Sequence, residues 1–129
     1  VEIDEIRARF GSEVAGMVDA VSEDPAIEGY AERKADLRRA AIAGGGGAAL
    51  IFAADRLANM RDWRTLDPGD REACAARLGT TLEERLRLWA EDLEAVTAHD
   101  PELPFLAEIE IELRELRADA DALAPNGAR

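Results

Sequence analysis

The sequence predicts an all-α protein. Apolar residues recur at steps of three and four along nearly every periodic segment, which is the spacing of one face of an α-helix. No segment shows the alternation of apolar and polar residues that is typical of a half-buried β-strand. Glycines and prolines stand between the periodic segments, where helices begin and end. With 129 residues, the chain has the length of one domain with one core.

Two helices are expected before residue 25. The first covers residues 4–10 and ends at Gly11, because glycine commonly follows the last residue of a helix. Ser12 is then a suitable N-cap for a second helix, which ends near Asp24-Pro25. The apolar residues of this second helix lie at helical spacing, at Val14, Met17, Val18 and Val21.

A third helix is expected from about residue 27 or 30 to residue 43. Its apolar face contains Leu37 and Ile42, and several charged residues lie on its other side. Four glycines at 44–47 follow it. Neither a preceding strand nor a following Lys-Ser/Thr accompanies them, so they predict a flexible connection and not a phosphate-binding loop.

Residues 50–61 predict a helix that is apolar around most of its circumference and that ends near Trp63. At about 100° per residue, one stripe consists of Leu50, Ala53, Leu57 and Met60. The opposite side carries Asp55, Asn59 and Asp62. Because Ile51 and Phe52 flank Asp55, its carboxylate is expected to cost several kcal/mol unless an ion pair, a hydrogen bond or a metal satisfies it.

The last third of the chain predicts one short helix and a helical hairpin. Asp67 is a suitable N-cap for a helix that begins at Pro68 and ends at Gly79. The next helix can begin with either of two capping boxes, Thr80 with Glu83 or Thr81 with Glu84. Two apolar stripes follow, first Leu82, Leu86, Trp89, Leu93 and Val96, then Leu106, Ile109, Leu113, Leu116, Ala120 and Leu123. Such stripes are typical of an antiparallel helical hairpin. The hairpin is expected to pack into the core of the chain, and the alternative is that it also forms the interface of a homodimer.

Composition excludes several classes of partner and site. A net charge of −12 argues against nucleic acid and anionic membrane surfaces as partners.

The single cysteine, Cys74, is expected to pack between helices, and its isolation fits a reducing, cytoplasmic location. The single histidine, His99, is expected at the C-terminal end of a helix, where it interacts favourably with the helix dipole. Trp63 and Trp89 are expected in the core.

Asp55 is the strongest candidate for chemistry. Asn59, four residues later, lies on the same helix face and is able to bond the carboxylate or to share a ligand with it. Arg56 and Arg61 border the same region and are able to bind anionic oxygens. This combination suits a metal with a phosphate-bearing substrate, whereas a structural ion pair is the alternative.

Three segments resemble one enzyme family. Residues 53–61, AADRLANMR, resemble the "(L/A)-A-D-R-L-x-N-M-R" segment of HD-domain phosphohydrolases, in particular the guanosine tetraphosphate pyrophosphohydrolases of the stringent response. Residues 6–22 resemble that family's "I-x-x-x-F-G-x-E-V-A-x-L-V-x-A-V-T". Residues 30–34 are similar to its basic "E-x-R-K" segment. The resemblance covers about residues 3 to 66.

The resemblance implies a metal site and a nucleotide site. In the family a metal, commonly manganese, is held by one histidine, an adjacent His-Asp pair and a later aspartate, and Asp55 falls on the later aspartate. Asn59 and Arg61 fall on positions that face the nucleotide, and Arg33 and Lys34 lie in the basic segment. The family often has threonine where this chain has Asp62, and a negative charge there opposes a polyphosphate.

The histidine and the His-Asp pair are expected upstream of Phe10. Nine residues precede Phe10 and none is histidine, and the first residue is Val1 rather than methionine, as expected if the metal-binding front half is missing. We therefore expect residues 1–66 to be the C-terminal portion of an HD-like domain. Residues 67–124 are a helical extension on the same core, and residues 125–129 are a flexible tail.

The predicted function is part of an HD-type, metal-dependent phosphohydrolase or pyrophosphohydrolase that acts on a nucleotide such as guanosine tetraphosphate. This chain alone is expected to be inactive, because it carries one of four metal ligands and no catalytic residue is assigned to it. A divalent metal, with manganese expected, belongs to the complete protein, whereas this chain alone, with one carboxylate ligand, is expected to hold it weakly or not at all. The alternative is a non-catalytic helical module for interaction or dimerisation.

Overall fold

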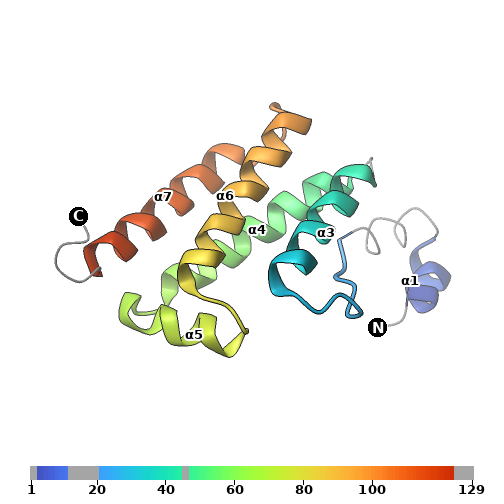
Figure 1. Cartoon of the computed structure of the whole chain (residues 1–129). Helices are drawn as coiled ribbons and strands as arrows, with labels where there is room; N and C mark the ends of the chain where they lie inside the picture. Colours follow the sequence, from blue (N-terminus) through green and yellow to red (C-terminus); the bar gives the residue numbers. More distant parts are fainter. Residues whose placement is uncertain (1–2, 12–20, 45–46, 124–129) are drawn as a thin grey trace. The chain divides into compact units, whose positions relative to one another are not determined.

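The computed structural model describes residues 3–11, 21–44 and 47–123 (Figure 1). This part of the chain contains α-helices and one short 3-10 helix and no strand, which confirms the all-α prediction for it. In chain order the elements are α1 (Ile3–Phe10), α3 (Tyr30–Ala43), α4 (Ala48–Thr65), η1 (Pro68–Asp70), α5 (Arg71–Arg77), α6 (Leu82–His99) and α7 (Leu106–Leu123). None of the described helices combines the length and the apolar character needed to cross a bilayer.

The chain divides into two compact units, Val1–Phe52 and Ala53–Arg129, and the division falls within α4. In the first unit, α1 ends where predicted, and Gly11 follows it with φ +93°, a left-handed conformation that glycine adopts readily. The helix predicted from Ser12 lies mostly at 12–20, outside the described residues. α3 begins at Tyr30, the later of the two predicted starts.

The apolar face of α3 differs in part from the prediction. Leu37 is buried as expected, but Ala41 is its buried companion and Ile42 is half-buried. Ala41 lies one turn after Leu37, about 40° away around the helix axis, whereas Ile42 is about 140° away. The helix therefore buries the smaller residue.

α4 buries most of the predicted stripe, as part of a wider face. Ala53, Leu57 and Met60 are buried, but Leu50 is 38% exposed. The buried face also includes residues that the predicted stripe left out, which are Ala48, Ala49, Phe52, Arg56 and Trp63. Their positions rotate the centre of the face away from Leu50. The helix also extends two residues past Trp63, to Thr65.

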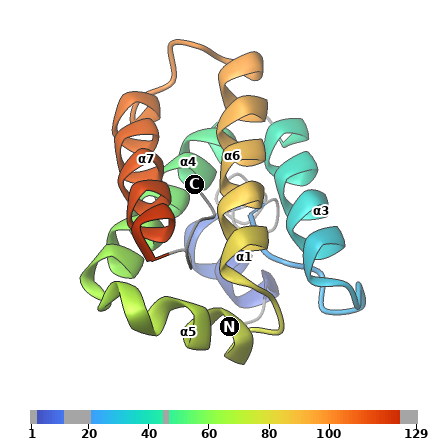
Figure 2. The ribbon, with the colours of Figure 1, turned by 60° about the vertical axis from the view of Figure 1, so that its left-hand side comes forward.

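In the second unit, the predicted hairpin is present. α6 and α7 lie side by side and antiparallel, joined by residues 100–105 (Figures 1 and 2). Thr81 is the N-cap of α6, and its hydroxyl accepts a hydrogen bond from Glu84 N at 3.1 Å, so the N-cap is that of the second alternative. The Glu84 carboxylate accepts from the Thr80 hydroxyl and not from Thr81 N, so only half of the predicted capping box is formed. The core takes residues from both predicted stripes, with Leu86, Trp89, Val96, Ile109 and Leu116 fully buried.

Local signals also place the ends of the shorter elements. Asp67 accepts a hydrogen bond from Gly69 N at 3.0 Å, and Pro68 begins η1, which leads into α5. Gly79 follows α5 with φ +82°. Cys74 is half-buried against the core and exposed His99 ends α6, both as predicted.

Two tryptophans and an arginine form the centre of this unit. The rings of Trp63 and Trp89 meet edge to face, with centroids 5.9 Å apart and planes at 84°. The guanidinium carbon of Arg85 lies 4.8 Å from the Trp63 ring centroid and 4.6 Å from that of Trp89. The predicted core position of both tryptophans is confirmed, and a buried cation accompanies them.

Arg71 joins the end of α4 to α7. It is 3% exposed, and Nη1 donates to Asp119 Oδ2 on α7 at 2.8 Å. Its other donors reach carbonyl oxygens at and just after the C-terminal end of α4, at Trp63 (3.1 Å), Arg64 (3.3 Å) and Leu66 (3.2 Å). Carbonyls at a helix end have no partner within the helix, so this single side chain satisfies several of them.

Candidate functional site

Asp55 lies on a half-exposed side of α4. Its side chain is 52% exposed, and the neighbouring Ile51 is 38% exposed, so the expectation of a carboxylate enclosed by apolar residues is wrong. The reason is the rotation of α4, which places Phe52 in the core and leaves Ile51 at the surface. Asp55 Oδ2 accepts hydrogen bonds from Arg56 Nη2 and, at 3.3 Å, from Asn59 Nδ2. Oδ1 receives none from the described residues.

Arg56 is the buried member of this group. Its side chain is 8% exposed and lies between two carboxylates, because Nη2 bonds Asp55 while Nη1 is 3.7 Å from Asp92 Oδ2 on α6. The Asp92 side chain is 3% exposed. Sequence reasoning missed Asp92, although a signal was present: it lies three residues after Trp89 and four before Val96, on the apolar stripe. A charged residue on such a stripe indicates a buried ion pair.

Arg61 does not join Asp55 and Asn59. It follows Asp55 by six residues, which places it about 120° away around the helix. Its Nε lies 3.7 Å from Glu112 Oε2 on α7, and Arg64 Nη1 donates to the other oxygen of Glu112 at 2.8 Å. The hydrogen bond to Glu112 raises the pKa of Arg64.

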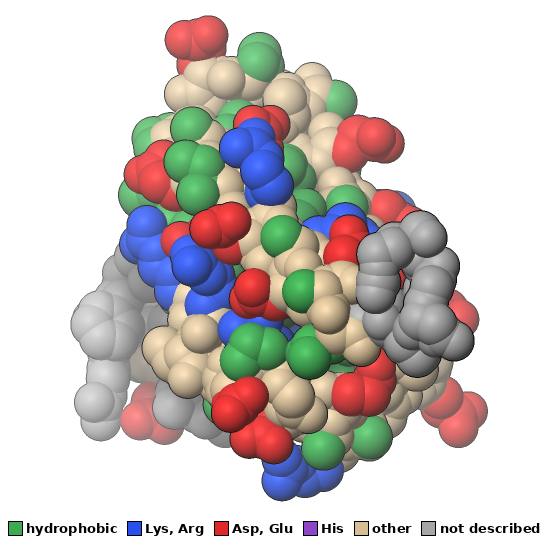
Figure 3. All heavy atoms as spheres, turned by 90° about the vertical axis from the view of Figure 1, so that its left-hand side faces the viewer, with side chains coloured by type: hydrophobic (Ala, Val, Ile, Leu, Met, Phe, Trp, Pro, Cys, Tyr) green, Lys and Arg blue, Asp and Glu red, His purple; other side chains and the backbone are tan. Residues whose placement is uncertain are grey.

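Acidic and basic side chains are interspersed on the face that Figure 3 shows, and no continuous patch of one sign covers it.

Arg33 and Lys34 lie in the first unit and act together there. Both bind Glu23, Arg33 Nε at 3.2 Å from Oε1 and Lys34 Nζ at Oε2. Arg33 Nη1 also donates to the carbonyl oxygens of Ile27 (3.2 Å) and Glu28 (2.9 Å). These contacts hold the turn that precedes α3 against the first turns of that helix. In this structure the two cations predicted to bind substrate are thus occupied by protein groups.

The pKa of Glu23 reflects these contacts. Partial burial by itself would raise it, but the hydrogen bonds and charges of Lys34 and Arg33 outweigh burial and lower the pKa below 4.5. A carboxyl group whose pKa is lower in the folded state stabilises the fold above its unfolded pKa. That stability is lost as the pH falls through the folded pKa.

Glu23→Gln is therefore expected to lower the melting temperature at pH 7 by about 3 °C, since the pair is partly exposed. The difference from wild type should shrink as the pH falls below 4.5. Circular dichroism melts between pH 7 and pH 2 measure it. Glu28→Gln, at an exposed glutamate of the same turn, serves as the control. A difference that stays constant with pH would contradict the role assigned to Glu23.

The described residues do not complete a metal site. Among them, no group of three or more histidine, cysteine, aspartate or glutamate side chains is placed to hold an ion. Asp55 supplies one carboxylate with an open oxygen, Asn59 steadies it, and Arg56 provides a competing cation. This arrangement fits a single ligand of a site and does not fit a whole one.

The segments that resemble the HD family are described unequally. Residues 53–61 are described in full and form the middle of α4. Residues 30–34 form the start of α3, whereas most of the 6–22 segment lies outside the described part of the chain. Comparison of the chain with family models, with curated proteins and with solved structures finds no match.

Proposed function

We propose that this chain is part of an HD-type, metal-dependent phosphohydrolase or pyrophosphohydrolase that acts on a nucleotide such as guanosine tetraphosphate. The observation that supports the proposal is the state of Asp55 within the AADRLANMR segment. Its carboxylate is half-exposed, Asn59 and Arg56 orient it through Oδ2, and Oδ1 stays open among the described residues. Metal-binding carboxylates are commonly oriented by such hydrogen bonds.

The proposed roles differ in how much rearrangement they require. Asp55 is available as one ligand, and Asn59 already orients it. Arg61 would have to leave Glu112, and Arg33 and Lys34 would have to leave Glu23, before they contact a phosphate. The other metal ligands that the resemblance implies are not among the described residues, so this part of the chain cannot carry out the hydrolysis by itself.

Asp55→Asn is expected to weaken the binding of Mn²⁺ to the complete protein, in which the remaining ligands are present, at least about tenfold, because an amide is a poorer ligand than a carboxylate and even outer-shell changes cost that much. Titration followed by the electron paramagnetic resonance of free Mn²⁺ measures the affinity. The matched control is Asp62→Asn, two turns further along the same side of α4. Equal losses in both variants, or none in Asp55→Asn, would contradict the role of Asp55.

The coding sequence upstream of the codon for Val1 provides the functional test. A reading frame that continues upstream and encodes a histidine and a His-Asp pair supports the proposal. Expression of that whole frame should then yield manganese-dependent release of pyrophosphate or phosphate from the nucleotide, while the 129 residues alone release none. A whole frame without these ligands and without activity would refute it.

A second candidate function is a non-catalytic helical module that forms a homodimer. It is favoured by the outer face of α7, where Ile111 is 51% exposed. Exposed alanines extend this face in both directions, at Ala107, Ala118 and Ala122. The alanines on this face allow close approach of a second helix, and the exposed side chains of Arg114 and Glu115 lie beside Ile111 on the next turn. Sedimentation equilibrium shows whether the chain forms a dimer, and the coding sequence shows whether a start codon lies at Val1. A dimer together with a start codon at Val1 favours the module.

A further inference from the structure

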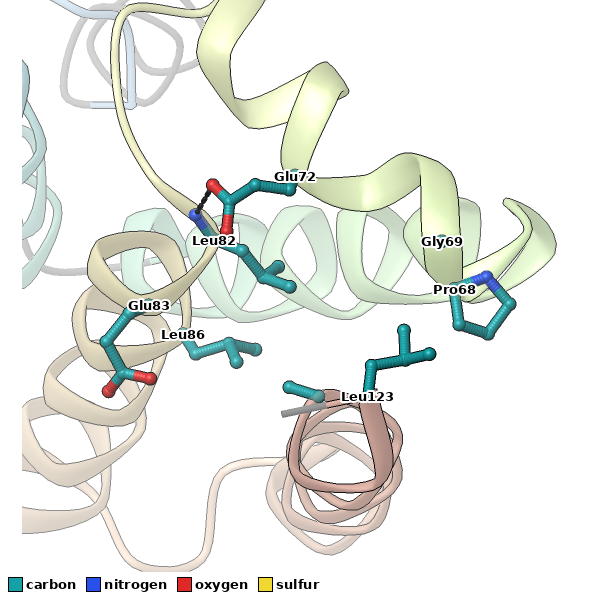
Figure 4. A pocket seen from close by; sticks show the side chains of 8 residues that line it. Pro68, Gly69, Glu72, Leu82, Glu83, Leu86 and Leu123 are labelled. Atoms are coloured by element: carbon teal, nitrogen blue, oxygen red, sulfur yellow. Dashed lines mark hydrogen bonds between the residues drawn. The ribbon is translucent and has the colours of Figure 1, made fainter. Parts of the chain in front are cut away.

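A cavity of about 440 Å³ opens between η1, the first turn of α6 and the last turn of α7 (Figure 4). Its walls are mostly apolar, formed by Pro68, Leu82, Leu86, Ala120 and Leu123, with Gly69 beside them. Two glutamates, Glu72 and Glu83, complete the lining. All of these residues belong to the second unit. The volume is in the range that small-molecule sites occupy. The cavity is open to solvent at one edge, where Glu72, Glu83 and Leu123 are exposed.

Glu72 is held in place at this edge. Its Oε2 accepts a hydrogen bond from Leu82 N, the first amide of α6, at 3.0 Å. The other carboxylate oxygen receives no hydrogen bond from the described residues, and Figure 4 shows it turned toward the Leu82 side chain and the cavity. The backbone bond therefore fixes a carboxylate with one oxygen available to a ligand.

Glu83, the second glutamate of the lining, is paired with Arg117 and does not face the cavity. Figure 4 shows its carboxylate directed away from the cavity, and its Oε1 accepts a hydrogen bond from Arg117 Nη1 at 3.3 Å. The side chains named in the lining include no lysine or arginine. The N-terminus of α6 carries only about half a positive charge, less than the full negative charge of Glu72. The cavity thus favours a cation over an anion.

We propose that this cavity binds a small amphiphilic cation, an aliphatic amine whose hydrocarbon chain contacts Leu82, Leu86 and Leu123 and whose ammonium group is bound by Glu72. The apolar walls disfavour a strongly hydrated ion, because they offer nothing to replace its water. They favour a hydrocarbon chain, whose transfer from water is worth about 0.8 kcal/mol per buried methylene. This site is independent of the function proposed for Asp55.

The test compares three probes of the same chain length by nuclear magnetic resonance, with hexylammonium, hexanol and hexanoate titrated into the 129-residue chain. Hexylammonium is expected to shift the signals of Leu82, Leu86 and Leu123 in a saturable manner. Hexanol should bind about tenfold more weakly, because it lacks the charge-assisted hydrogen bond to Glu72. Hexanoate bound as tightly as hexylammonium, or no saturable shift with hexylammonium, would overturn the proposal.

Two variants separate the apolar walls from the charge. Ala120→Leu fills the cavity and should abolish binding of hexylammonium, whereas Ala122→Leu, the same change at an exposed site on α7, should leave it unchanged. Glu72→Gln keeps an acceptor for Leu82 N and removes the charge, so it should reduce hexylammonium to the affinity of hexanol. Binding that neither Ala120→Leu nor Glu72→Gln weakens would place the probe elsewhere and refute this site.

Discussion

Replacement of Trp89 with alanine is expected to lower the free energy of unfolding by about 4 kcal/mol. Trp89 is 2% exposed, so the change removes a fully buried ring and leaves a cavity in the core. It also removes the edge-to-face contact with Trp63 and one of the two rings that flank Arg85. Arg85 then stays buried with less compensation for its charge. Urea unfolding followed by circular dichroism measures the change.

The matched control for Trp89→Ala is Leu78→Ala. Leu78 is 49% exposed, so its truncation should change stability by no more than about 0.5 kcal/mol. Trp89→Phe keeps an aromatic ring and should lie between the two variants. A loss of less than about 1 kcal/mol in Trp89→Ala would show that this ring is not central to the core.

Arg71→Ala is expected to lower the free energy of unfolding by about 3 kcal/mol. The guanidinium donates to carbonyl oxygens at and after the end of α4 and to Asp119 on α7. Its removal leaves these buried or half-buried acceptors without their donor. Each unsatisfied buried acceptor costs about 1–3 kcal/mol. The total loss of stability is smaller than the sum of these costs, because Asp119 is 41% exposed and water hydrates its carboxylate.

The control for Arg71→Ala is Arg77→Ala, an exposed arginine at the other end of α5 that should have little effect on stability. Arg71→Lys separates charge from geometry. Lysine keeps the ion pair with Asp119 but lacks the planar fork, so most of the loss should remain. If Arg71→Ala proves as mild as Arg77→Ala in urea unfolding, the connection from α4 to α7 does not depend on this residue.

The helix ends were predictable because they depend on neighbouring residues. Thr81 caps α6, Asp67 caps η1, and glycines at 11 and 79 take left-handed conformations just after helices. Each of these signals acts within one turn of the chain. The contact between Asp55 and Asn59 belongs to the same class, since residues four apart on a helix always share a face.

The rotation of each helix was harder to predict. Periodicity alone placed Leu50 in the buried stripe of α4, but the structure exposes it and buries Ala49 and Phe52. On a helix that is apolar around most of its circumference, several stripes fit the spacing equally well. The choice among them depends on which side the neighbouring helices cover, and that information lies outside the segment.

The sequence by itself determined the helical class, the order of the described helices, several of their ends, and the local Asp55–Asn59 pair. The tertiary structure alone decided that Asp55 is half-exposed and that Arg56 lies between it and Asp92. It also decided that Arg61 pairs with Glu112 on α7. The physical reason is distance along the chain: caps and periodicity act over three or four residues, whereas these ion pairs join residues that meet only when whole helices pack.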